Sequence, residues 1–175
     1  MDDRTKNMVD ECKRQEESCL YTSVSLFEWL KCLRFWRVVF VIAPIICGAL
    51  ATWPLFAKDP GFAWVTGVFA LLAGVAPAIY KALDLDVSLR LVAEHASKFK
   101  ILQDRFRQAW RVSALGAPDD FKKEFDKLMA RTDDARSASL TAPERFFKKA
   151  RAKVQAGHYD FAVDGNPVPG STGRP

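Results

Sequence analysis

The side chains that could do acid–base, nucleophilic or metal chemistry are few in this sequence and lie far apart. The two histidines, His95 and His158, stand about 60 residues apart, and neither belongs to a cluster of metal ligands. We interpret His95 as an ordinary polar residue of a helix and place His158 at the start of a C-terminal tail. No phosphate-binding glycine loop, HExxH or GxSxG motif occurs. We therefore expect no enzyme activity, no metal and no cofactor.

Thiols and one pair of carboxylates are the remaining candidates. None of the cysteines forms a CxxC pair, and we interpret them as reduced thiols. They are Cys12, Cys19, Cys32 and Cys47. Asp84 and Asp86 could form a cation site, but acids at the start of a helix are the simpler interpretation, because they suit the helix dipole.

Two long uncharged runs dominate the chain, which has 175 residues and a net charge of +5. Residues 38–57 form 20 consecutive positions without a charged residue or histidine, and residues 60–80 form 21 more. Each run exceeds the roughly 18 residues that a membrane-spanning helix needs. The polar island between them is very short. The first 34 residues are polar and of mixed charge, so we expect no signal peptide.

Each run contains a proline and a stripe of small residues. Pro44 and Pro77 would each cost about 3 kcal/mol inside a helix in water, whereas bundles of membrane helices tolerate proline. Small residues at helical spacing allow two helices to approach closely in lipid. We predict helix packing or pore lining for seven of them: Ala43, Cys47, Gly48, Ala51, Ala70, Gly74 and Ala78. The simpler alternative is that alanine and glycine are common in membrane helices.

Helices are also predicted on both sides of these runs. Residues 4–33 carry a loose apolar stripe of Val9, Cys12, Cys19, Leu26 and Leu30, interrupted by Glu16 and Ser23. After the second run, apolar residues recur every three or four positions, as in a coiled coil. We predict that they form the seam of a homo-oligomer: Leu85, Leu89, Val92, Ala96, Phe99, Leu102 and Phe106.

Two shorter helices should follow, over residues 118–136 and 143–156. Gly116 is the expected stop before the first, and Thr141, Pro143 and Glu144 resemble a capped start of the second. The last helix is basic, with Arg145, Lys148, Lys149, Arg151 and Lys153. These cations could be a solvated face, contact anionic lipid headgroups, or bind a phosphate-bearing ligand. Specific nucleic-acid binding is not expected, because the region is mixed in charge.

Cations flank the two apolar runs on one side only. Lys31, Arg34 and Arg37 precede the first run and Lys81 follows the second, whereas the connection offers only Lys58. By the positive-inside rule, both termini should be cytoplasmic. We expect an all-α membrane protein, a two-helix transmembrane hairpin with long N- and C-terminal cytoplasmic helical extensions. Its expected regions are an N-terminal helix (1–34), two spans (35–57 and 62–81), a tip (58–61), a cytoplasmic helical region (82–156) and a disordered tail (157–175).

Several stretches resemble the SLATT domain family of bacterial two-span membrane proteins. They are EESCLYT at residues 16–22, VIAPIICGALATW at 41–53, LDLD at 83–86 and AEHASKFKILQDRFR at 93–107. The resemblance covers roughly residues 10–160, and its motifs are diffuse rather than catalytic. It implies a pore-forming or membrane-disrupting effector in nucleotide-signalled bacterial defence.

The expected function is therefore that of an oligomeric effector that permeabilises the bacterial inner membrane in an antiviral, abortive-infection response. Its expected partners are membrane lipid, further copies of itself, and a cyclic nucleotide or a nucleotide-sensing protein. Two alternatives remain open at this point. One is a membrane-anchored scaffold that recruits a cytoplasmic partner without pore activity, and the other is a soluble bundle in which the apolar helices are buried.

Overall fold

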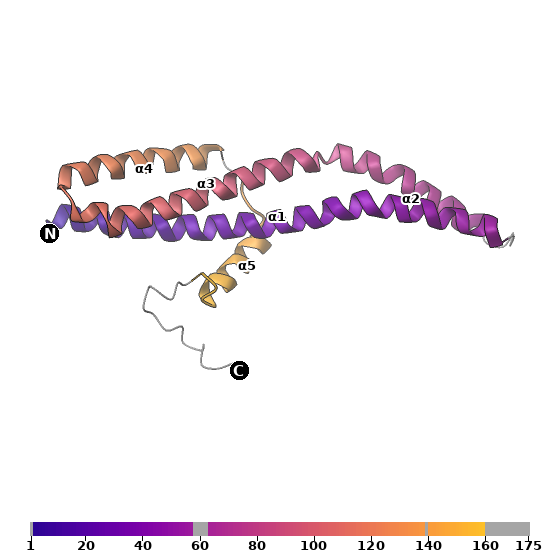
Figure 1. Cartoon of the computed structure of the whole chain (residues 1–175), viewed down its shortest axis with the longest axis horizontal. Helices are drawn as coiled ribbons and strands as arrows, with labels where there is room; N and C mark the ends of the chain where they lie inside the picture. The colour runs from indigo at the N-terminus through magenta and orange to yellow at the C-terminus, as the bar shows by residue number, and fades with distance from the viewer. Residues whose placement is uncertain (1, 58–62, 139, 160–175) are drawn as a thin grey trace. The chain divides into compact units, whose positions relative to one another are not determined.

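The computed structural model describes residues 2–57, 63–138 and 140–159, and these residues form helices and short connections without any strand. The helices are α1 (Asp3–Ala57), α2 (Ala63–Ala82), α3 (Leu85–Arg111), the 3₁₀ turn η2 (Ser113–Leu115), α4 (Pro118–Ala138) and α5 (Glu144–Gln155) (Figure 1). The predicted all-helical class is confirmed. The predicted tip at 58–61 and residues 160–175 of the predicted tail lie outside the described residues.

The chain divides into two compact units. The first contains residues 1–29 and 92–175, and the second contains residues 30–91. The first unit therefore holds the polar part of α1, most of α3, and α4 and α5. The second holds the apolar part of α1, α2 and the first residues of α3. The polar and apolar parts of the sequence thus form separate structural units.

The core of the first unit is formed by apolar stripes at helical spacing. On α1, Val9, Cys12, Cys19 and Leu26 of the predicted stripe are buried in this unit, and Leu30, the fifth residue of the stripe, is buried in the second unit. α3 contributes Val92, Phe99 and Phe106, and α4 contributes Phe121 and Leu128. Phe106 is completely buried and Phe121 is 1% exposed, so these aromatic rings supply the largest apolar areas of the core.

The helix boundaries in this unit follow the turn residues closely. α3 ends at Arg111, η2 follows, and the backbone N–H of Gly116 donates to the Ser113 carbonyl at 3.1 Å. α4 then begins at Pro118, a position where proline loses no helical hydrogen bond. The predicted threonine cap of α5 is wrong. Pro143 occupies the cap position, no side-chain hydrogen bond caps the helix, and the N–H of Phe146 donates to the Pro143 carbonyl.

In the second unit, the described residues of the two apolar runs are helical, and Pro44 and Pro77 lie within the helices. α1 continues through Pro44, and α2 contains Pro77. α2 and α3 are separated by a break at Leu83 and Asp84, where Asp84 has a φ of 43°. This left-handed conformation is uncommon for residues with a side chain, although aspartate tolerates it better than most. The break marks the end of the apolar sequence.

Candidate functional site

The apolar helices of the second unit present large side chains to their surroundings. α1 exposes Val38, Val41, Ile42, Ile45, Ile46 and Leu50, and α2 exposes Trp64, Val68, Leu71, Leu72, Val75 and Ile79. In the most apolar 18-residue stretch of α1 only 6% is buried, and in that of α2 none is buried. The core helix of a soluble protein would be mostly buried. Both helices are therefore long and apolar enough to cross a membrane, and the chain itself does not cover them.

The two stripes of small residues differ in their surroundings. On α1, Ala51 is buried at 8% exposure, and Ala43 and Cys47 are partly covered. On α2, the predicted stripe of Ala70, Gly74 and Ala78 is exposed. A Cβ added at Gly48 or Gly74 would have no neighbouring atom within 4 Å. The two stripes therefore do not face one another within one chain, and a role of the α2 stripe in packing between chains or in lining a pore stays a prediction.

A charged contact lies where the apolar sequence ends. Arg37 Nε on α1 lies 3.0 Å from Asp86 Oδ1 on α3, and the Tyr80 hydroxyl on α2 donates to Asp86 Oδ2 at 2.7 Å. Asp86 thus accepts from two helices, in addition to lying in the first turn of α3. The Arg37 and Asp86 side chains are about half exposed, at 55% and 45%, so this ion pair adds little to stability. The two contacts of Asp86 join α1, α2 and α3 at the place where the apolar sequence ends.

The basic helix α5 is held by a buried carboxylate. Lys153 Nζ lies 2.6 Å from Glu28 Oε1, and Lys149 Nζ lies 2.9 Å from Oε2 of the same residue. The Glu28 side chain on α1 is only 1% exposed. A buried carboxylate requires compensating positive charge, because desolvation strongly disfavours an isolated ion. Phe146 and Ala150 are the buried residues of α5 itself.

The five cations predicted to contact phosphate or lipid therefore have different roles. Lys149 and Lys153 hold α5 on α1, as described above. Lys148 pairs with Glu144 one turn earlier at 2.8 Å, and the Arg145 guanidinium lies 4.6 Å from the centre of the Phe146 ring. Arg151 is exposed, and its side chain makes no hydrogen bond or ion pair to another described residue. A contact with lipid or phosphate by the exposed members of this group stays a prediction.

A second carboxylate of α1 joins α3 to α1 in the first unit. Arg107 Nε and Trp110 Nε1 donate to the two oxygens of Glu16, each at 2.6 Å. The Glu16 and Arg107 side chains are 14% and 24% exposed, so this contact is shielded from solvent. α4 is tied to the same part of α1, since Arg136 donates to Gln15 Oε1 at 2.8 Å. In the sequence, Glu16 only interrupts the apolar stripe of residues 4–33. In the structure, it joins α1 to α3.

The predicted oligomer seam is covered within a single chain. All seven residues are buried: Leu85, Leu89, Val92, Ala96, Phe99, Leu102 and Phe106. Their exposed fractions range from 0% to 8%. The periodicity correctly indicated a buried face, but the face packs against the chain's own helices. A homo-oligomer would therefore need another surface.

Two of the four thiols, Cys12 and Cys19, and the buried histidine also lie in the first unit. Burial raises the pKa of Cys12 from 9.0 to about 12, with the nearby charges of Glu11 and Glu124 adding to the effect. Burial raises the pKa of Cys19 to about 11, although Arg136 partly offsets it. Both thiols are free. His95 was expected to be an ordinary polar residue, but it is only 6% exposed, and its Nδ1 has no partner among the described residues.

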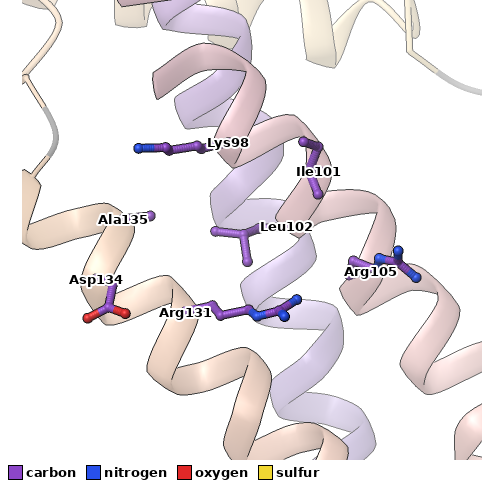
Figure 2. A pocket seen from close by; sticks show the side chains of 7 residues that line it. All are labelled: Lys98, Ile101, Leu102, Arg105, Arg131, Asp134 and Ala135. Atoms are coloured by element: carbon purple, nitrogen blue, oxygen red, sulfur yellow. The ribbon is translucent and has the colours of Figure 1, made fainter. Parts of the chain in front are cut away.

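An open cleft of about 270 Å³ lies between α3 and α4 (Figure 2). Lys98 extends from α3 and Arg131 extends from α4, and each reaches across the gap toward the other helix. Leu102 and Ala135 line the cleft between them, at 6% and 7% exposure. Arg105 lines it one turn beyond Leu102. The sequence pattern did not indicate this site, because its residues come from two helices and Leu102 had been assigned to the seam.

The charges of the cleft are incompletely neutralised. Lys98 Nζ lies 2.6 Å from Glu94 Oε1, outside the cleft lining, and this hydrogen bond and charge lower the pKa of Glu94. Arg105 donates to the amide oxygen of Gln108 at 3.2 Å, which is a neutral partner. Within the described part of the chain, the Arg131 side chain has no hydrogen bond or ion pair. Asp134 is the one carboxylate in the cleft lining.

No family model, no curated protein and no solved structure matches this chain. Among the residues that the structure describes, no group of three or more histidine, cysteine, aspartate or glutamate side chains could hold a metal ion. The candidate functional features of the described residues are thus the uncovered apolar helices, the ion pairs that join the helices, and the basic cleft.

Proposed function

We propose that the chain is a membrane protein in which α1 and α2 form a transmembrane hairpin. The observation that carries this proposal is the exposure of twelve large apolar side chains on the two helices, between 43% and 69% each. Fully burying such a side chain is worth about 1.5–3 kcal/mol. Leaving twelve of them half exposed in water would therefore cost on the order of 10 kcal/mol. This cost is comparable to the whole net stability of a domain.

Both helices continue through a proline, which also supports a lipid environment for α1 and α2. In lipid, α1 and α2 satisfy their backbone groups internally, and neighbouring helices can compensate for the carbonyls freed by Pro44 and Pro77. The cations Lys31, Arg34 and Arg37 lie before the first span, and Lys81 lies at the end of the second. We place this end in the cytoplasm of a bacterium, with both termini on that side of the inner membrane.

The resemblance to the SLATT family suggests what such a hairpin does. In our proposal, the chain is an oligomeric effector that permeabilises the inner membrane in a nucleotide-signalled antiviral response. A cyclic nucleotide or a nucleotide-sensing protein provides the trigger. Residues 38–57 and 60–80 contain no carboxylate, histidine or basic residue. A coupled proton or ion carrier would require such residues, so leakage through an assembly fits the spans better.

Several copies are needed for leakage, because two helices cannot enclose an aqueous path. The predicted seam is buried within the chain, so it is a poor surface for assembly. The exposed stripe of Ala70, Gly74 and Ala78 on α2 is a better one. Small residues in lipid allow close approach between helices, and a Cβ at Gly74 would meet no atom of its own chain. We therefore assign chain-to-chain contact to this face of α2.

Dye or ion leakage from liposomes containing the purified full chain tests this proposal, with and without cyclic nucleotides and, where identified, a sensing partner. We expect ligand- or partner-dependent leakage, and we expect Gly74→Leu to abolish it by blocking close approach. Ala49→Leu is the matched control, because it adds similar bulk to an exposed position of α1 outside the small stripe. Tight liposomes under every ligand and partner condition would exclude a pore.

A membrane-anchored scaffold is the second candidate function, and the charged contacts of α5 favour it. Helix α5 is docked on α1 through Glu28, which would present a fixed cytoplasmic surface to a partner. Expression in bacteria separates the two functions. A scaffold should be tolerated at high levels, whereas a pore-forming protein should arrest growth, and Gly74→Leu should relieve the arrest. If the protein were extracted without detergent, both membrane functions would be excluded.

A further inference from the structure

The cleft between α3 and α4 combines an apolar floor with cations from two helices. On α3, Lys98, Leu102 and Arg105 follow one another at intervals of four and three residues, so they share one face. On α4, Arg131 and Ala135 are four residues apart and face the same gap. Leu102 and Ala135 are the buried part of the lining, and the cations stand at its edges. Such a lining suits a ligand with both an apolar and an anionic part.

The charge of the lining identifies the sign of that ligand. Lys98, Arg105 and Arg131 bring three positive charges, and Asp134 brings one negative charge. Lys98 is also paired with Glu94, but that ion pair is exposed, with side chains 48% and 58% accessible, and exchanges readily with solvent. Arg131 has no partner within the described residues. A guanidinium that reaches into a gap without pairing with a carboxylate is well suited to a phosphate, which it can bind with two parallel hydrogen bonds.

We propose that this cleft binds a small organic phosphate. Its phosphate group binds the Arg131 guanidinium, its apolar or aromatic part covers Leu102 and Ala135, and Lys98 adds positive charge at the other edge of the cleft. The volume of about 270 Å³ is near the lower end of small-molecule sites, so the ligand is of mononucleotide size or smaller. The same chemistry occurs in a free organic phosphate and in an acidic lipid headgroup. The binding site lies wholly in the first unit, so it does not depend on the proposed membrane activity.

Calorimetric titration of the full chain in non-ionic detergent tests the site. AMP is the probe for a free organic phosphate, and dihexanoyl phosphatidic acid is the probe for a lipid headgroup. Two further compounds serve as controls. Inorganic phosphate carries only the anionic part of the proposed ligand, and adenosine carries only its aromatic part. We expect AMP or the phosphatidic acid to bind at least tenfold more tightly than either control, and we expect the affinity to fall with added salt.

Charge-reversal variants assign the binding to the cleft. We expect Lys98→Glu and Arg131→Glu each to weaken binding at least tenfold, and Arg131→Gln to weaken it less. Lys122→Glu is the control, because it makes the same charge change at an exposed position of α4 outside the cleft lining. It should change the affinity less than twofold. Circular dichroism and thermal unfolding of each variant show whether the helices remain folded.

Each outcome of these titrations decides the question. Binding of AMP alone identifies a free organic phosphate, and binding of phosphatidic acid alone identifies a headgroup site. The proposal is overturned if neither probe binds, or if Arg131→Glu and Lys122→Glu reduce the affinity equally. It is also overturned if inorganic phosphate binds as tightly as AMP. Liposome leakage is measured separately, so failure here leaves the proposed membrane function unaffected.

Discussion

Lys153 on α5 and Glu28 on α1 form an ion pair of 2.6 Å, although 125 residues separate them in the chain. The Glu28 side chain is 1% exposed and that of Lys153 is 34% exposed. The basic character of α5 thus has a structural cause, because a carboxylate withdrawn from water requires a cation. Two of the cations that seemed available to ligands are used inside the protein.

Lys153→Ala should therefore release α5 from α1. Loss of one partner of a shielded ion pair costs about 1–3 kcal/mol, and Lys149 limits the loss because it remains beside Glu28. Hydrogen–deuterium exchange of residues 144–155 measures the effect. Lys148→Ala is the matched control, since its ion pair with Glu144 is exposed on both sides and should be worth less than about 0.5 kcal/mol. Equal exchange in the two variants would contradict a specific role of Glu28.

Phe106→Ala tests whether the predicted seam belongs to the core of a single chain. Phe106 is completely buried, and truncation of a buried phenylalanine costs about 3–5 kcal/mol. Ile101→Ala, at a position 58% exposed on the same helix, should cost less than about 1 kcal/mol. Thermal unfolding in detergent at several protein concentrations gives the measurement. A loss that depends on protein concentration would place Phe106 in an interface between chains.

The buried thiols make stability dependent on alkaline pH. Below their ordinary pKa of 9.0, the thiols of Cys12 and Cys19 are neutral in both the folded and unfolded chain. Above it, the unfolded thiols ionise while the folded ones stay neutral, because burial raises their pKa to about 12 and 11. The free energy of unfolding should therefore fall above pH 9, by up to about 1.4 kcal/mol per pH unit for each thiol, until the folded pKa is reached.

Denaturant unfolding of the wild type and Cys12→Ala between pH 8 and pH 10.5 isolates the contribution of one thiol. The variant should be less stable at pH 8, because it lacks a buried side chain, but its stability should decline less steeply with pH. Parallel slopes in the two proteins would contradict the raised pKa of Cys12. Lysines and tyrosines also titrate in this range, so the difference between the slopes is the informative quantity.

The contact between Arg37 and Asp86 should couple α1 to the start of α3 only modestly. Both side chains are about half exposed, so we expect a coupling energy of about 0.5–1 kcal/mol in a double-mutant cycle of Arg37→Ala and Asp86→Ala. Tyr80→Phe should add a further small loss, because the Tyr80 hydroxyl also donates to Asp86. Thermal unfolding provides the measurement, and additive losses for Arg37→Ala and Asp86→Ala would show that the ion pair is not formed.

Local sequence patterns were sufficient for the presence of the helices and for some of their ends. The two uncharged runs and the start of α4 at Pro118 each depend on neighbouring residues, so the sequence alone predicted them. α3 ends at Arg111, before the predicted stop at Gly116, which instead ends the short turn η2. The threonine cap was wrong, because Pro143 took the cap position and no side-chain hydrogen bond caps α5. The length and apolar character of the runs in α1 and α2 are also a property of composition, whereas their exposure is not.

Only the tertiary structure decided what covers each face and which charges pair. Helical periodicity identifies an apolar face, but it cannot distinguish a partner chain from another helix of the same chain, and so the seam from Leu85 to Phe106 was assigned to an oligomer. Glu16 pairs with Arg107 across 91 residues, and Glu28 pairs with Lys153 from still further away. The cleft likewise requires α3 and α4 to lie side by side. These contacts depend on distances in space, which local patterns do not contain, and they determine which cations remain free to bind a ligand.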